Sequence, residues 1–240
     1  PKCGWRTHVD IKGPLHVKGR RQGSTTKADA LYAIIFTDDK SRRRYVKHLS
    51  NLKNLHTHVS DYIDHANMHG HQCKIFRFDQ QFDTEAMSKL FATKQCLKEC
   101  SAAYCQSQDG VAEASMKQWQ KACRAILRDQ NREAVHWTDA STMLIKTLNR
   151  LYSSASPDAT PEEQWTREIP DGGILRVPLC DAFFFRYKDE RNTTFDDRHT
   201  RGILIDYPST ERSYTILTPD GLTHDRRYED VKFDERSKLP

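Results

Sequence analysis

The feature that most constrains the fold is a change of pattern about two thirds of the way along the 240-residue chain. The earlier part combines dense apolar runs, typical of strands, with segments that repeat apolar residues every three or four positions, typical of helices. A segment rich in Ser, Pro, Asp and Thr follows, and short strand-like segments with polar turns come after it. The sequence therefore predicts an α/β domain over residues 1–155, a linker over 156–170 and a small all-β domain over 171–240.

Strand-like and helix-like segments follow one another in a definite order in the first region. Strands are predicted at residues 7–11, 31–37, 44–49, 73–78 and, weakly, 96–101. Helices are predicted at residues 51–70, 84–94, 109–129 and 133–152, capped in the first three cases by Asn51 or Ser50, by Thr84 and by Asp109. This order predicts an α/β layer with a mixed sheet. In such sheets functional groups gather at strand ends and at the starts of neighbouring helices.

The second region has the spacing of an all-β domain. Strands are predicted at residues 174–187, 202–207, 213–217 and 228–233, with a turn at TPDG, residues 218–221. Short strands with polar turns between them are typical of a small barrel or sandwich.

Composition narrows the class of protein. Hydrophobic residues make up 37% of the chain and charged residues 30%, and the formal net charge is +5, which favours an anionic partner without requiring one. Seven cysteines at irregular spacing predict no disulfide framework, and Cys96, Cys100 and Cys105 lack the second pair that a structural zinc site needs. No apolar run is long enough to span a bilayer and no signal peptide opens the chain, so we expect an intracellular protein without a membrane partner. The absence of Met at position 1 predicts a processed product or a fragment.

Three carboxylates are candidates for metal chemistry. Asp10 lies in or at the end of the first predicted strand, Asp79 ends the central one, and Glu113 lies in the first turns of the long helix. Mg²⁺ takes oxygen ligands, and a pair of such ions can hold the attacking and leaving oxygens of a phosphoryl transfer. Each residue also has a purely structural interpretation, because Asp is a common turn residue and Glu is favoured at a helix N-terminus.

Basic and polar residues on the long helix are candidates for nucleic-acid contact. Lys117, Gln120 and Arg124 fall on the same predicted helix face as Glu113. A basic stripe beside a metal site can bind phosphates, although a solvated helix face explains the same pattern. The run SRRRY, residues 41–45, allows two interpretations as well: contact with a nucleic-acid backbone, or protection of a sheet edge by charge.

Several segments, in order, resemble copia-type retrotransposon integrases. HVDIKGPL (residues 8–15) resembles the first-aspartate segment, FTDDKSRRRYVKHL (36–49) the family's hairpin, and KIFRFD (74–79) the strand of the second aspartate. AAYCQSQDGVAEASMKQ (102–118) resembles the segment that carries the glutamate. In the second region TPEEQW (160–165), ILRVPLCDAFF (174–184) and YEDVKFDE (228–235) resemble elements that follow the core in this family.

The resemblance implies a fold, a cofactor and a reaction. The fold is a ribonuclease H-like mixed sheet with flanking helices, followed by a small all-β domain of the SH3-like barrel type. The implied ligands of Mg²⁺ (or Mn²⁺) are Asp10, Asp79 and Glu113, and Lys117 occupies a position that is basic and contacts DNA in the family. The implied reactions are trimming of the element's DNA ends and joining of the new 3′-hydroxyl to target DNA. Assembly as a homo-oligomer and a place in the nucleus are implied by the same analogy.

The sequence also departs from the family pattern. Gln80 and Gln81 replace the Asn-Gly that follows the second aspartate, Ala114 replaces the Arg after the glutamate, and the separation of the last two acids is two residues shorter than usual. These changes predict a decayed or domesticated copy. Two alternatives to an active integrase therefore stay open: a catalytically silent nucleic-acid-binding remnant, and a ribonuclease H-like nuclease.

Overall fold

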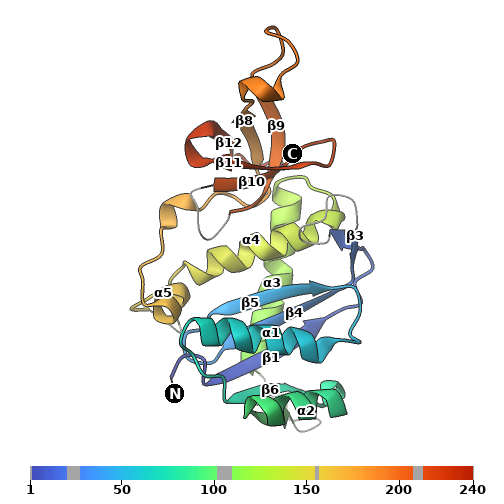
Figure 1. The fold of residues 1–240 in the computed structure, drawn as a ribbon, viewed down its shortest axis with the longest axis vertical. Coiled ribbons are helices and arrows are strands. Elements are labelled where there is room, and N and C mark those ends of the chain that lie inside the picture. Colours follow the sequence, from blue (N-terminus) through green and yellow to red (C-terminus); the bar gives the residue numbers. More distant parts are fainter. Residues whose placement is uncertain (1, 21–27, 102–109, 155–156, 208–212, 240) are drawn as a thin grey trace. The chain divides into compact units, whose positions relative to one another are not determined.

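The computed structural model describes residues 2–20, 28–101, 110–154, 157–207 and 213–239 (Figure 1). The chain forms two compact units, each of which is built from more than one segment. The first unit comprises residues 1–18, 29–121 and 145–170, and the second comprises residues 19–28, 122–144 and 171–240. The long helix α3 (Gly110–Asp129) and the following helix α4 (Trp137–Asn149) contribute residues to both units.

A five-stranded mixed sheet forms the centre of the first unit. Its strand order is β5-β4-β1-β6-β7, with β1 antiparallel to β4 and parallel to β6, and with β6 parallel to β7. The strands are β1 (Arg6–Lys12), β4 (Tyr32–Asp38), β5 (Arg44–Leu49), β6 (Ile75–Asp79) and β7 (Leu97–Ser101). The five strands predicted in this region are confirmed, including the weak one at β7. The short strands β2 (Gly19–Arg20) and β3 (Ala28–Ala30) were not predicted.

The sequence of β4 explains its place inside the sheet. Six of its seven residues are buried, and an unbroken apolar run is typical of a strand that is covered on both faces. Ile34 and Phe36 point into the main core, whereas Ala33 and Ile35 alternate with them and face the other side.

Helices α1 (Leu55–Met68) and α2 (Glu85–Lys94) also belong to the first unit. Thr84 caps α2 as predicted, because its side chain accepts a hydrogen bond from the backbone N–H of Met87. The N-cap of α1 is Asn54, so the predicted cap at Asn51 or Ser50 was wrong. Asn51 instead accepts a hydrogen bond from the backbone N–H of Lys53. This local hydrogen bond turns the chain and delays the start of the helix.

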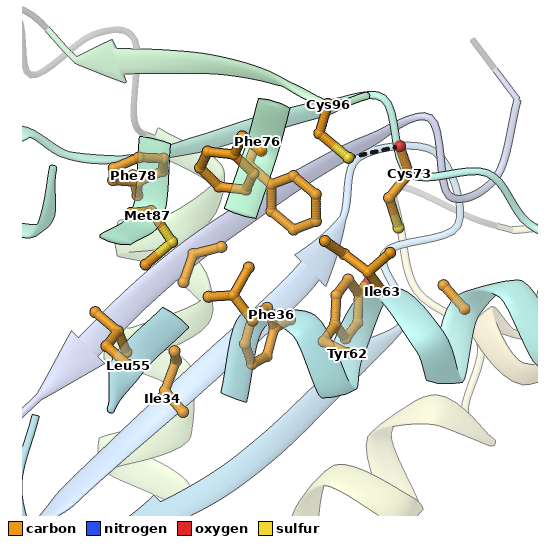
Figure 2. Close-up of a cluster of buried hydrophobic side chains, with 14 of the residues drawn as sticks. Ile34, Phe36, Leu55, Tyr62, Ile63, Cys73, Phe76, Phe78, Met87 and Cys96 are labelled. Carbon is orange, nitrogen blue, oxygen red and sulfur yellow. Dashed lines mark hydrogen bonds between the residues drawn. The ribbon is translucent and has the colours of Figure 1, made fainter. Parts of the chain in front are cut away.

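The core of the first unit is aromatic (Figure 2). Phe36 of β4 stacks on Tyr62 of α1 with ring centroids 4.4 Å apart, and Phe76 of β6 stacks on Phe91 of α2 at 5.2 Å. Such pairs stabilise a core beyond their area burial by about 1 kcal/mol each. The apolar stripes of both helices therefore pack on one face of the sheet and leave the other face for α3.

Residues 161–166 form a helix, α5 (Pro161–Thr166), inside the segment expected to be a linker. Thr160 and Glu163 form a capping box at its start, and Trp165 is only 1% exposed. The carbonyl of Trp165 lies 2.7 Å from Nε2 of His71, and the guanidinium of Arg43 lies over the indole ring. The polar composition indicated a linker, but one buried tryptophan is enough to hold this segment in the core.

The apolar side that the sequence predicts for α3 consists of Ser115 and Trp119, which are buried, and of Val111, Ala122 and Ile126, which are half-buried. The buried side also carries Ala112, Met116 and Cys123, so the helix is rotated by about one residue from the predicted phase.

The second unit holds a five-stranded sheet in which all neighbours are antiparallel. Its order is β11-β10-β9-β8-β12. The strands are β8 (Asp181–Phe185), β9 (His199–Asp206), β10 (Ser213–Leu217), β11 (Thr223–Arg227) and β12 (Val231–Asp234). The predicted turn at residues 218–221 is present, since the N–H of Gly221 donates to the carbonyl of Thr218 at 2.9 Å.

Arginines take part in the packing of the second unit. The guanidinium of Arg176 lies between 5.3 and 5.9 Å from the ring centroids of Tyr214, Tyr228 and Phe233. It also donates hydrogen bonds to the hydroxyl of Tyr228 and to the carbonyl oxygens of two nearby residues. The buried carboxylate of Asp181 accepts hydrogen bonds from Arg132 at 2.7 Å and from Arg201 at 2.8 Å. These cations are therefore paired within the unit.

Candidate functional site

The structure places the first two predicted acids near the carboxyl ends of neighbouring parallel strands. Asp10 lies in β1, and Asp79 is the last residue of β6. The register of this pair ends with His8 opposite Arg77, and Asp10 and Asp79 each lie two residues beyond that last pair. Because side chains alternate along a strand, the two aspartates fall on the same sheet face as His8 and Arg77.

The third acid, Glu113, lies in the first turn of α3 on the same side of the sheet. The hydroxyl of Thr37 donates to that of Ser115 at 3.2 Å, which fixes the first turns of α3 against the face that Thr37 shares with His8 and Asp10. Glu113 itself accepts a hydrogen bond from Lys117 at 3.3 Å, and its side chain is 44% exposed.

The described residues do not complete a metal site. Asp10 and Asp79 supply the oxygen donors that Mg²⁺ prefers, on rigid adjacent strands. However, no group of three or more His, Cys, Asp or Glu side chains close enough to hold a metal ion occurs in the described part of the chain. Asp10 and Asp79 lie on neighbouring strands, and Glu113 forms an ion pair with Lys117. Asp109, the predicted cap of α3, lies outside the described residues.

The predicted DNA-contacting residues project from α3. Lys117 and Arg124 are exposed, and Gln120 is half-buried. The Lys117 side chain is 77% exposed and contacts Glu113 one turn earlier. A surface ion pair at this spacing contributes less than about 0.5 kcal/mol, so a phosphate can displace it at little cost.

An ion network lies beside the two aspartates. Glu99 of β7 accepts hydrogen bonds from Arg77 at 2.7 Å and from Arg6 at 3.1 Å, and Asp39 contacts Nε2 of His8 at 3.1 Å. Burial raises the pKa of Glu99, but the hydrogen bond from Arg77 and the charge of Arg6 outweigh it and lower the pKa overall. Two cations of this sheet face are therefore held by acids of the same face.

One group of residues was missed by the sequence analysis. Arg44, at the start of the edge strand β5, donates hydrogen bonds to the side chains of Ser115 at 3.2 Å and of Gln118 at 2.7 Å. The buried side chain of Asn149 bonds to both the N–H and the carbonyl of Arg44, at 2.9 and 2.8 Å. The SRRRY run was a signal for this region, but it could not show which arginine points inward.

Five cysteines can be placed in the structure, whereas Cys105 lies outside the described residues. Cys3, Cys73, Cys96, Cys123 and Cys180 are free, and the thiol of Cys96 donates to the carbonyl of Cys73 at 3.1 Å (Figure 2). Burial raises the pKa of Cys73, Cys123 and Cys180 to about 12. These thiols therefore behave as buried, protonated side chains near neutral pH.

None of the helices in the described ranges is long and apolar enough to cross a membrane.

Comparison with known proteins places the fold. No family model and no curated protein matches the sequence. Among solved structures, a chain of the cryo-EM structure of the simian T-cell lymphotropic virus intasome in complex with PP2A regulatory subunit B56 gamma is similar, with a TM-score of 0.50 and 9% identity. The match covers 98% of this chain and 83% of the other. A likeness at this identity concerns the fold alone, and on that basis the chain has an integrase-like fold, with a mixed α/β unit and a separate antiparallel β unit.

Proposed function

We propose that the chain is the catalytic core and the following β domain of a copia-type retrotransposon integrase, and that it processes DNA ends and joins them to target DNA. The single observation that carries the proposal is the parallel pairing of β1 and β6, the neighbouring strands on which Asp10 and Asp79 lie. The ordered motif matches and the integrase-like fold support it. The finer assignments, a ribonuclease H-like core and an SH3-like barrel, belong to the same proposal.

Asp10 and Asp79 would hold Mg²⁺ (or Mn²⁺), and Glu113 would join them by leaving Lys117. A bound metal supplies polarisation of the scissile phosphate and activation of the attacking oxygen. The chain's own contribution is rigidity, because both aspartates lie on strands inside a five-stranded sheet. A carboxylate carried by a strand keeps its position better than one carried by a loop.

DNA is the proposed partner, both as element ends and as target. Lys117, Gln120 and Arg124 would contact its phosphates, and such contacts position the duplex without reading its sequence. Binding would therefore be salt-sensitive and largely independent of sequence. The solved neighbour is part of an intasome, so we propose that this chain also assembles as a homo-oligomer on DNA, in the nucleus.

A catalytically silent nucleic-acid-binding remnant is the second candidate. One observation favours it: Glu113 is paired with Lys117, and the described residues contain no three-ligand metal group. A remnant would keep the fold and the charge of α3 but would bind no catalytic metal.

Metal titration separates the two candidates. For the integrase, calorimetry should detect binding of Mn²⁺ to the full chain, and Asp79→Asn should lose it. Asp64→Asn, which alters an exposed acid of α1, should bind Mn²⁺ like the parent. If the parent binds no Mn²⁺, or if Asp79→Asn binds it equally well, the remnant is the better description.

An oligonucleotide assay separates the integrase from a nuclease. Labelled DNA ends that become joined to a target duplex support the integrase. Cutting of an RNA–DNA hybrid without joining of DNA ends supports the ribonuclease H-like nuclease instead.

A further inference from the structure

A cleft of about 570 Å³ lies in the first unit, between the start of α3, the C-terminal part of α4 and the beginning of β5. Its volume falls within the usual range of small-molecule sites. One side is cationic and polar, and the other is apolar and aromatic. The lining residues that matter here are Arg42, Arg44, Ala114, Gln118, Tyr152 and Ser153.

The cationic side carries no acid among the residues that the structure describes there. Among the described residues that line the cleft there is no Asp or Glu. Arg44 is half-buried, and its guanidinium donates only to the neutral side chains of Ser115 and Gln118 in the hydrogen bonds that the structure shows. Burial lowers the pKa of Arg44, and the charge of Arg42 lowers it further. A partly buried cation beside a like charge is stabilised most by an added anion.

Arg42 is only partly neutralised. Its guanidinium lies 3.3 Å from the carboxylate of Asp39, but that carboxylate also contacts His8 at 3.1 Å and Arg6 at 3.9 Å. One acid is therefore shared among several basic groups, and the pair Arg42–Arg44 keeps an excess of positive charge at the cleft.

The opposite side of the cleft suits an organic group. Leu151 and Tyr152, two and three residues after the end of α4, are 47% and 65% exposed. An exposed tyrosine offers a ring on which a nucleobase can stack. A planar guanidinium fork at Arg44 matches two oxygens of a phosphate.

We propose that this cleft binds a phosphate group carried by a nucleotide, with Arg44 on the phosphate and Tyr152 on the base. The phosphate belongs either to a free mononucleotide or to the backbone of a single-stranded nucleic acid. Neither Asp10 nor Asp79 is among the residues that line the cleft. This proposal depends on the proposed function only because a nucleic acid is chosen as the probe.

Fluorescence anisotropy on the full chain tests the proposal, in the absence of divalent metal so that the outcome does not depend on Asp79. The probe is a fluorescein-labelled oligothymidylate, with thymidine 5′-monophosphate and inorganic phosphate as competitors. Arg44→Gln should weaken binding about tenfold, as expected for losing a charge-assisted contact, and should lower the salt dependence by about one phosphate contact. Lys53→Gln, an equal change of charge at an exposed position outside the cleft, should bind like the parent.

A second variant guards against misfolding of Arg44→Gln. Ala114 is exposed and lines the cleft, so Ala114→Glu adds a negative charge there without disturbing the core. It should weaken binding as much as Arg44→Gln does, whereas Ala92→Glu, on the exposed side of α2, should not. Tyr152→Ala should weaken the oligonucleotide but not inorganic phosphate.

Each outcome decides a separate point. Displacement of the probe by the mononucleotide identifies a phosphate monoester as the ligand, and dependence on Arg44 without such displacement identifies the backbone diester. If both cleft variants bind like their controls, or if the parent binds no phosphate probe, the proposal is overturned. DNA binding that ignores Arg44 leaves the proposed function intact, and phosphate binding without strand transfer leaves the cleft intact.

Discussion

Arg132 and Arg176 of the second unit differ from Arg44 of the first unit in the groups that hold them. In the second unit Arg176 lies among three aromatic rings, and Arg132 pairs with the buried carboxylate of Asp181. In the first unit Arg44 is held by the neutral side chains of Ser115 and Gln118. A cation with a carboxylate or a set of rings contributes to folding, whereas a cation that lacks both is available to a ligand. We therefore expect Arg132 and Arg176 to stabilise the fold and Arg44 to bind a ligand.

The largest effect is expected at Asp181. This carboxylate is 4% exposed and contacts Arg132, Arg201 and Lys238. Asp181→Asn removes the charge and leaves Arg132 half-buried without its acid, which should cost about 3 kcal/mol. Urea denaturation of the full chain measures the loss. The exposed Asp189→Asn is the control, and an equal stability of both variants would contradict a structural role for this charge cluster.

Arg176→Ala should cost about 2 kcal/mol. The variant loses the contacts with three rings and the hydrogen bond to Tyr228, each worth a fraction of a kcal/mol to about 1 kcal/mol. Thermal denaturation should show a clear decrease in Tm, with the exposed Arg227→Ala unchanged. If the Tm of Arg176→Ala falls no further than that of Arg227→Ala, the contacts between Arg176 and the three rings do not contribute to stability.

Acid should weaken the first unit through a buried histidine. Burial lowers the pKa of His48 from 6.5 to about 3, so the folded chain keeps this ring neutral where the unfolded chain protonates it. The resulting stability is complete above about pH 6.5 and is lost as the pH falls toward 3, by up to about 1.4 kcal/mol per pH unit. Denaturation across this range should show the slope, and His48→Gln should reduce it. The exposed His199→Gln should keep the parental slope, and a shared slope in all three proteins would exclude His48 as its source.

Arg44→Met should change stability least, by less than about 1 kcal/mol in either direction. An apolar side chain can replace a poorly paired, half-buried cation at almost no cost. Together with Arg176→Ala, this variant is the sharpest test of the comparison, because only the arginine of the second unit should be needed for folding. A loss above about 2 kcal/mol in Arg44→Met would show that this arginine is structural too.

Much of the local structure could be predicted from the sequence. The strands at residues 44–49 and 213–217 and the end of α3 at Asp129 agree with the predicted bounds, and Thr84 caps α2 as expected. Each of these features depends on residues that are close in sequence. The strands follow from an alternation of apolar residues, and the cap follows from a hydroxyl that accepts a hydrogen bond from the N–H three residues later. Local interactions of this kind leave a readable pattern.

Other elements depend on distant partners. The strand β11 has the sequence THDRR, which lacks any apolar alternation, and it exists because β10 supplies its hydrogen bonds. The predicted strand over residues 174–187 is much shorter in the structure, where β8 spans Asp181–Phe185 and residues 172–174 form a 3-10 turn. α5 is held in place by the buried Trp165, and the residues around Trp165 in the sequence do not predict its burial.

By itself the sequence determined the order of the main strands and helices of the first unit and the candidate acids, Asp10, Asp79 and Glu113, because periodicity and residue type are properties of short segments. Only the tertiary structure decided that β1 and β6 run parallel, that Glu113 forms an ion pair with Lys117, and that the described residues lining the cleft of Arg44 include no acid. The reason is physical: strand pairing and the solvation of a charge depend on groups brought together from far along the chain. The type of a side chain limits the interactions that it can form, and residues far away in the sequence determine which of these interactions form in the folded chain.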